Sequence, residues 1–218
     1  MNIFWWAKFR STKSGIKLHT LFDSKSSIPS FMYISEAKLH DVRILGYLDY
    51  EAGSFYVMDK AYIDYKRLYV RHIRKAYFVI RAKSNMRFRL MYSRKVDKTT
   101  TIKYDQIGKL AGVYSQKYHP EKLRKIKFYD SENQRENIFI TNNMTVEATE
   151  ITELYKERWK VELFFKWIKQ HLKVKTFWGQ NPDDIKTQIY CAIITIVWQL
   201  FAAVNLNLKG KSTKYYRF

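Results

Sequence analysis

Cysteine is almost absent from this chain of 218 residues, since Cys191 is its only one. A single cysteine cannot form an intramolecular disulfide, which fits a protein folded in a reducing cytoplasm. Cys191 lies in an apolar run, and we therefore expect a small buried side chain rather than a reactive thiol.

Long hydrophobic runs are also scarce. The longest covers residues 189–204 and contains Thr195 and Gln199, whereas a bilayer span needs roughly 20 apolar residues. We expect a buried core helix there, with a membrane-associated helix as the alternative. The first ten residues lack a basic region ahead of a longer apolar core, so we expect no signal peptide.

Acidic residues are few. Lys and Arg number 40 against 20 Asp and Glu, which gives a formal net charge of +20. This surplus opposes compaction and favours a polyanionic partner, nucleic acid first and an anionic membrane surface as the alternative. The basic residues are spread along the chain, and 46% of all residues are hydrophobic, so we expect a folded basic surface around a packed core.

The first part of the chain has the pattern of a mixed α/β fold. Residues 17–23 and 28–35 predict a hairpin, and residues 36–48 a helix. A β-α-β unit is then expected from a strand at 55–59, a helix at 62–73 and a strand at 76–80.

Polar side chains follow the two strands of that unit. Asp59 closes the first strand, while Arg81 and Lys83 follow the second. Open α/β sheets place functional groups at this edge, so we expect an acid there beside cations that nucleic acid can approach. For Asp59, the alternative is an ordinary helix N-cap.

The sequence pattern changes over residues 86–143, where short stretches of alternating polar and apolar residues carry Arg and Lys between Tyr and Phe. The pattern predicts a basic antiparallel β segment. Such a surface suits phosphate contacts and base stacking, although an amphipathic sheet with a solvated basic face has the same pattern.

A long helix is expected from about residue 145, capped by Thr145 or Thr149, to about residue 172. A helix turns by about 100° per residue, so four polar residues share one sector beside an apolar stripe. These four are Tyr155, Arg158, Glu162 and Lys169. A solvated face with ion pairs between successive turns is the alternative.

The spacing Tyr-x2-Arg-x3-Glu-x6-Lys resembles the signature of the DDE transposases of bacterial insertion sequences, the insertion-sequence-four group. Upstream stretches around residues 4–10, 15–20, 57–65 and 77–85 are similar to the catalytic domain of that family. The resemblance implies that Asp59 and Glu162 are the second and third metal-binding carboxylates. It implies that Tyr155, Arg158 and Lys169 hold DNA near the cleavage site, and that the metal is Mg²⁺ or Mn²⁺, bound as two ions.

The implied architecture is a ribonuclease-H-like α/β fold, a mixed sheet with helices interrupted by an antiparallel β insertion. We assign residues 1–85 to the first part of the catalytic domain, 86–143 to the basic insertion, 144–206 to the catalytic-helix part and 207–218 to a basic tail. The first carboxylate belongs to an Asp-Ser-Thr-like motif on the first, central strand, and no such strand precedes residue 4. We therefore expect a chain truncated at its N-terminus.

The resemblance implies a DNA transposase of the cut-and-paste type, which cleaves transposon ends and transfers the strand into target DNA. We expect this copy to keep DNA affinity without cutting, in the bacterial cytoplasm with the nucleoid. A non-enzymatic DNA-binding protein or inhibitor is the alternative. The expected partners are DNA and either a second copy or a full-length transposase, with no membrane.

Overall fold

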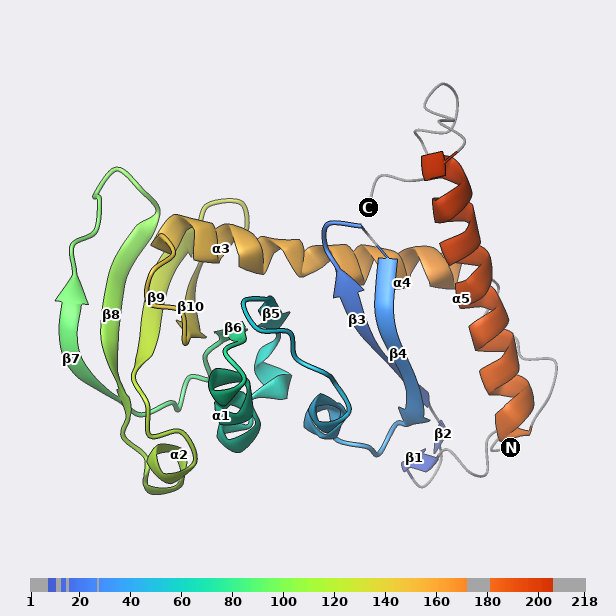
Figure 1. Cartoon of the computed structure of the whole chain (residues 1–218), viewed down its shortest axis with the longest axis horizontal. Helices are drawn as coiled ribbons and strands as arrows, with labels where there is room; N and C mark the ends of the chain where they lie inside the picture. The colour runs from blue at the N-terminus through green and yellow to red at the C-terminus, as the bar shows by residue number, and fades with distance from the viewer. Residues whose placement is uncertain (1–7, 11–12, 15, 27, 172–180, 206–218) are drawn as a thin grey trace. The chain divides into compact units, whose positions relative to one another are not determined.

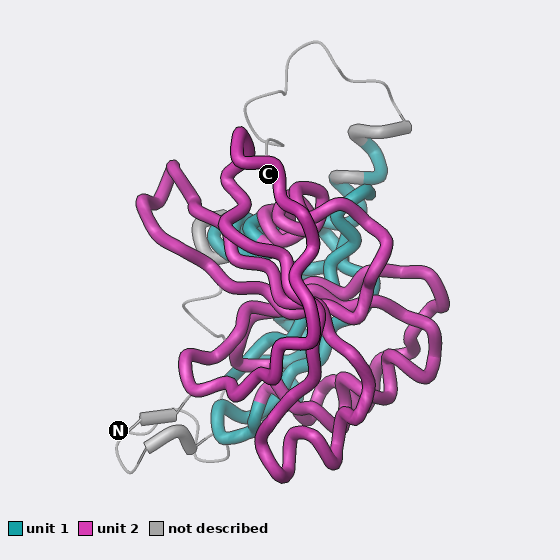
Figure 2. The backbone as a smooth tube through the Cα atoms, turned by 90° about the vertical axis from the view of Figure 1, so that its left-hand side faces the viewer, with its two compact units in different colours: residues 1–40, 159–218 teal, residues 41–158 magenta. Residues whose placement is uncertain are grey.

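The computed structural model describes residues 8–10, 13–14, 16–26, 28–171 and 181–205. The predicted basic tail lies outside these residues. The chain divides into two compact units, residues 1–40 with 159–218 as unit 1 and residues 41–158 as unit 2, coloured teal and magenta in Figure 2. Each unit is described by itself.

Unit 2 is built on a six-stranded mixed sheet in the order β5-β6-β10-β9-β8-β7 (Figure 1). Only β5 and β6 pair in parallel, and the other neighbours are antiparallel. The strands are β5 (Phe55–Met58), β6 (Tyr77–Arg81), β7 (Phe88–Arg94), β8 (Ile102–Leu110), β9 (Leu123–Asp130) and β10 (Arg135–Thr141). The sheet and its helices confirm the predicted α/β class and are consistent with a ribonuclease-H-like transposase fold.

The segment predicted as an insertion contributes β7 to β10 to the same sheet as β5 and β6. Along the chain, the boundaries between the two compact units fall between residues 40 and 41 and between residues 158 and 159. These boundaries differ from the predicted ones. The domain assignment and the missing central strand stay predictions. The hairpin of unit 1 forms a two-stranded sheet of its own.

The β-α-β unit is present as predicted. Helix α1 (Tyr65–Ile73) connects the parallel strands β5 and β6, and the Asp64 side chain caps it by accepting from the Arg67 backbone N–H. A short 3₁₀ helix, η2 (Lys60–Tyr62), lies between β5 and α1. The helix expected over residues 36–48 is wrong, because only η1 (Asp41–Gly46) forms there, a 3₁₀ helix that buries the adjacent Ile44 and Leu45.

The sheet of unit 2 is covered on both faces. Successive side chains of a strand point to opposite faces, so Phe78 and Ile80 pack with Leu68 of α1, while Val79 packs with Ile151 of α3. Helix α3 spans Ala148–Glu157. Because β6 is buried on both sides, its sequence is a continuous apolar run, as expected for a central strand.

The predicted long helix is two helices, α3 and α4 (Trp159–His171). Arg158 separates them, although its own backbone stays in the helical region. Neither predicted threonine cap is correct, because Glu147 occupies the N-cap position and makes no side-chain cap bond. Asn143 instead orders the preceding turn by accepting from the backbone N–H groups of Thr145 and Val146.

Unit 1 contains the predicted hairpin, β3 (Ile16–Asp23) paired with β4 (Ile28–Glu36). It also contains the short strands β1 (Lys8–Arg10) and β2 (Lys13–Ser14), helix α4, and helix α5 (Pro182–Asn205). The hairpin packs on both helices through two apolar clusters.

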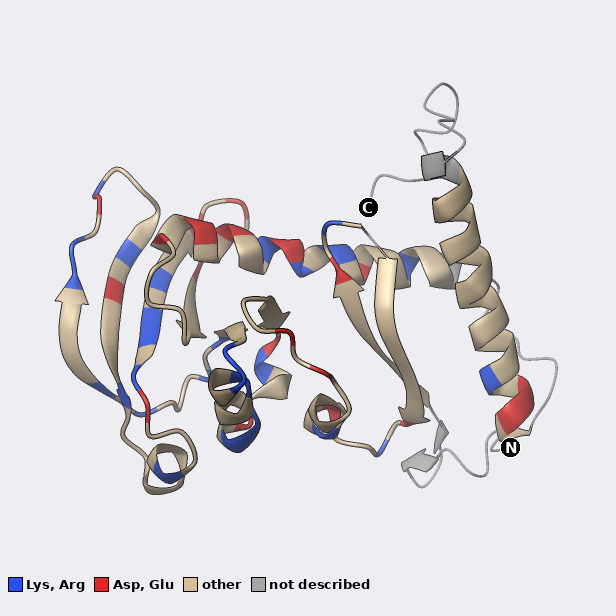
Figure 3. Cartoon of the chain, in the orientation of Figure 1, with Lys and Arg blue, Asp and Glu red and all other residues tan. Residues whose placement is uncertain are grey.

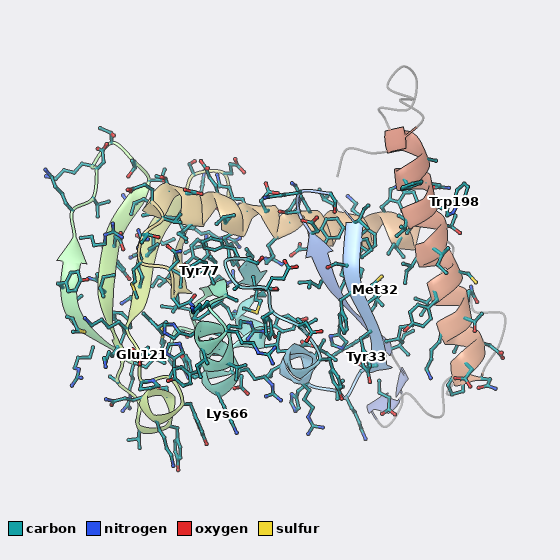
Figure 4. All side chains as sticks on the ribbon, in the orientation of Figure 1. Met32, Tyr33, Lys66, Tyr77, Glu121 and Trp198 are labelled. Atoms are coloured by element: carbon teal, nitrogen blue, oxygen red, sulfur yellow. The ribbon has the colours of Figure 1, made fainter. Side chains whose placement is uncertain are left out.

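Helix α5 has two distinct sides. Its buried side carries isoleucines at helical spacing, namely Ile185, Ile189, Ile193 and Ile196. Its other side exposes large apolar residues such as Trp198, which is 71% exposed (Figure 4). Cys191 lies on this exposed side, so the expectation of a buried cysteine is wrong. Within the described residues, no helix is long and apolar enough to cross a membrane.

Helix α2 (Val113–Tyr118), which the sequence did not predict, ends at a buried histidine, His119. Its ring lies among Tyr69, His72 and Phe78, with ring centroids 5.4, 5.7 and 6.2 Å away. Burial first, and the neighbouring His72 second, lower the pKa of His119 to about 4.

This neutral histidine makes stability depend on pH. Its pKa is about 6.5 in the unfolded chain and about 4 in the folded one. Its contribution is therefore complete above pH 6.5 and is lost as the pH falls through 4, which removes roughly 2–3 kcal/mol. Urea unfolding of the wild type and of His119→Phe at pH 7 and at pH 4.5 measures this effect. We expect the variant to lose less stability between the two pH values, and equal losses contradict the assignment.

Candidate functional site

Asp59 lies immediately after β5, at the edge where the sequence predicts an acid. Its Oδ1 accepts a hydrogen bond of 2.5 Å from the Lys60 backbone N–H, and it is the N-cap of η2. The alternative role as a helix cap is therefore present as well. The side chain remains 36% exposed, so capping leaves the carboxylate accessible.

Arg81 ends the neighbouring strand β6 on the same edge, because β5 and β6 run in parallel. Its Nη2 lies 3.7 Å from Asp59 Oδ1, which makes an ion pair beyond hydrogen-bonding distance. Lys83 follows in the turn after β6 and is exposed. The structure thus brings Asp59 and Arg81 together, with the more exposed Lys83 two residues beyond Arg81.

Tyr155 approaches the same carboxylate from α3. Its ring packs on Phe139 with centroids 4.2 Å apart, and the Arg158 guanidinium lies 5.6 Å from its ring centroid. Burial is the largest cause that raises the pKa of Tyr155; Arg158 lowers it and Asp59 raises it. The pKa of Tyr62 is raised to about 12, again chiefly by burial, with Asp41 and Asp59 adding to the shift. Both phenols keep their protons at neutral pH and can donate hydrogen bonds.

The other two predicted residues lie in unit 1. Glu162 is exposed in the first turn of α4. Lys169 belongs to the same helix, and its side chain lies outside the described residues. That Glu162 and Asp59 share a metal, and that all four residues of the predicted sector act together, stay predictions.

Sequence reasoning missed a buried ion pair in unit 2. Asp105 of β8 and Arg124 of β9 are 4% and 0% exposed, and they are joined by two parallel hydrogen bonds of 2.8 Å. A signal was present, since Arg124 is in phase with the inward-facing Ile126 and Phe128 of its strand. A charge at such a position needs a buried partner.

Basic residues extend well beyond the Asp59 edge (Figure 3). On β9, Lys125 lies over the rings of Phe88 and Tyr104, at 5.3 and 5.1 Å from their centroids. Burial, and then the neighbouring Lys127, lower the pKa of Lys125. The predicted interleaving of cations and aromatic rings is therefore present as side-chain contacts.

The donor chemistry of the Asp59 edge fits a hard divalent cation in part. A partly exposed carboxylate is a ligand that Mg²⁺ accepts, and Mg²⁺ sites often use one or two carboxylates with several waters. Within the described residues, no three acidic, histidine or cysteine side chains gather into a metal-binding group. Asp59 is thus a candidate ligand from unit 2.

A strand-end carboxylate, a cation on the parallel neighbour and a phenol from the covering helix thus gather at one edge of unit 2. The family model of the transposase DDE domain matches residues 4–198, and the chain belongs to this family. Proteins of the DDE family use a divalent metal.

Curated relatives point the same way. The chain is 32% identical over 202 residues to "Putative transposase y4zB" of Sinorhizobium fredii, covering 91% of this chain and 56% of that protein. It is 27% identical over 194 residues to "Probable transposase for insertion sequence element IS5377" of Geobacillus stearothermophilus, covering 88% and 50%. A third relative, "Putative transposase for insertion sequence element IS4SA" of Synechocystis, is 28% identical over 149 residues, which cover 63% of this chain and 38% of that protein. The chain thus spans about half the length of the first two.

Proposed function

We propose that this chain serves an insertion-sequence transposase as its DNA-processing part. Its partners are transposon ends and target DNA, and the reaction is metal-dependent cleavage followed by strand transfer. The observation that carries the proposal is the Asp59 edge of unit 2, where Arg81 lies 3.7 Å from the carboxylate in a chain of net charge +20. The family membership supports it.

Each side chain has a role that its position supports. Asp59 and, from unit 1, Glu162 provide oxygen ligands for Mg²⁺ or Mn²⁺. The metal that these carboxylates would hold would lower the pKa of an attacking water and stabilise the leaving oxygen. Arg81 and Lys83 contact backbone phosphates, and the protonated Tyr155 donates to a phosphate oxygen.

Cleavage requires a balanced exchange at phosphorus. The oxygen of water bonds to phosphorus, its proton passes to solvent, and the 3′-oxygen leaves as a hydroxyl. In strand transfer that 3′-hydroxyl gives its proton to solvent and bonds to a target phosphorus, and the target's own 3′-oxygen leaves and takes up a proton. The residues of the chain hold the DNA backbone in line for both steps.

The test is nicking of supercoiled DNA that carries the transposon ends, with Mg²⁺ or Mn²⁺, by the whole chain and by Glu162→Ala and Asp59→Asn. Nicking that needs the metal and is lost in both variants supports the roles of these acids and contradicts the expectation that this copy does not cut. Lys186→Gln is a matched control, because Lys186 is already paired with Asp183 at 3.2 Å, and it should nick like the wild type. Nicking that survives both acidic substitutions disproves the roles of these acids.

A DNA-binding protein that does not cut is the second candidate. It is favoured by the Arg81 guanidinium, which lies against the carboxylate that the metal needs. Tight, salt-dependent DNA binding without nicking under any metal condition selects this candidate. If the chain neither binds nor cuts DNA, both candidates are wrong.

A further inference from the structure

Two arginines and one aspartate of unit 2 meet just ahead of α3. Besides its two hydrogen bonds from Arg124, Asp105 has Arg94 Nε 3.7 Å from its Oδ2. We call Arg94, Asp105 and Arg124 the arginine clamp. They come from three adjacent strands, β7, β8 and β9, so the clamp ties the outer part of the sheet together.

Both arginines also hold the backbone that leads into α3. Arg94 Nη1 donates to the Met144 carbonyl at 3.0 Å, and Arg124 Nη1 donates to the Val146 carbonyl. The Asn143 side chain orders the same turn from within by accepting from the Val146 backbone N–H. The turn before α3 is therefore held both by the two arginines of the sheet and by the side chain of its own residue Asn143.

The position of the clamp does not serve the stability of the helix itself. The N-terminus of a helix carries partial positive charge, which disfavours cations beside it. Glu147, at the N-cap, makes no side-chain cap bond, while two arginines donate to the carbonyls just before it. Asp105 neutralises part of their positive charge. We therefore interpret the two arginines as contacts that hold the start of α3 in place on the sheet.

The position and tilt of α3 on the sheet determine where the Tyr155 side chain lies. From Ala148 to Tyr155 the helix advances by seven residues, or about 10 Å, and a small tilt at its start moves the phenol. The Tyr155 ring packs on Phe139 of β10 and belongs to the same apolar cluster as Val57 of β5, two residues before Asp59. The charges of Asp59 and Arg81 also act on its pKa.

We propose that the arginine clamp is a set of positioning residues, which fixes the start of α3 and thereby places the Tyr155 phenol beside Asp59 and Arg81. The importance of that placement for DNA processing rests on the proposed function. The placement itself can be measured without DNA or metal, so the two can fail separately.

The experiment reads the ring ¹³C and ¹H shifts of Tyr155 at pH 7 in the full chain labelled at tyrosine, with Tyr155→Phe to assign them. In the wild type, we expect Asp59→Asn to move these shifts, because it removes a nearby charge. In Arg94→Met we expect the same substitution to move them less than in the wild type, and Arg94→Lys, which keeps a donor near Met144, restores part of the response.

Arg89→Met is the matched control, since Arg89 is an exposed arginine of the same strand, and it should keep the full response to Asp59→Asn. Arg94 is 31% exposed in its side chain, which makes it the clamp member best suited to substitution in a folded protein. If Arg94→Met responds like the wild type, or if Arg89→Met loses the response equally, the positioning role is overturned. Should Arg94→Met not fold, Arg94→Gln against Arg89→Gln removes the charge from each position and gives the same comparison.

Discussion

Replacing Arg124 by Ala is expected to lower the free energy of unfolding by about 3–5 kcal/mol, because it leaves a buried carboxylate without its main partner. Arg124 is fully buried and Asp105 nearly so, and their two hydrogen bonds lie far from solvent screening. The substitution also leaves the Val146 carbonyl without this donor. Urea unfolding followed by circular dichroism measures the loss, and a change below about 1 kcal/mol contradicts it.

Two controls separate charge from packing. Arg135 lies 3.9 Å from Asp130 with 57% of its side chain exposed, and Arg135→Ala should leave the stability nearly unchanged. The pair Arg124→Met with Asp105→Leu removes both buried charges and should be more stable than Arg124→Ala alone. It need not reach the wild type, because Arg94 and the Val146 carbonyl remain. If the double variant has the same free energy of unfolding as Arg124→Ala, the loss of stability comes from altered packing rather than from an unpaired charge.

The affinity for DNA is expected to fall by about 10³ to 10⁵ between 50 and 200 mM salt, if the chain contacts six to ten phosphates. The physical cause is the release of counterions from DNA as Lys and Arg replace them. The net charge of +20 supplies the cations, and Figure 3 shows them over the strands and helix α1 of unit 2 rather than in one block. Fluorescence anisotropy with a labelled duplex at four salt concentrations gives the slope.

Single substitutions localise this contact. Lys125→Gln should weaken binding to all sequences and reduce the salt slope by about one, because no carboxylate is seen to pair with Lys125 in the described residues, while Lys127 adds to its positive surroundings. Lys186→Gln removes an equal charge that Asp183 already neutralises, and it should change the slope less. An affinity that does not respond to salt argues against phosphate contacts altogether.

Local patterns predicted most of the strands and helices. The hairpin of unit 1 and the β-α-β unit followed from apolar runs separated by turn residues, which report on a few neighbouring positions. Helix α2 was missed because its six residues bury no side chain completely and so leave no periodic pattern. Cys191 was misplaced because an apolar run does not tell which side of a helix meets the core, whereas the isoleucines of α5 at helical spacing do.

One part of the site could be predicted from the sequence, namely the neighbouring positions of Asp59 and Arg81. Parallel strands end at the same edge, and this rule places Asp59 and Arg81 together. The arginine clamp needed the pairing of strands 19 residues apart, which no local pattern supplies. The break at Arg158 was also beyond reach, since α3 and α4 are both apolar on one side and the residue between them keeps helical backbone angles.

The sharing of one carboxylate by two guanidinium groups has an evolutionary consequence. Asp105 cannot change alone, since its loss leaves two cations facing each other. Neither arginine can change alone, because the Asp105 carboxylate then loses one of its two positive partners. The three positions should therefore be inherited as a block among relatives. The lysines on the solvent side of the same strands can exchange with arginine one at a time, since only their charge is required.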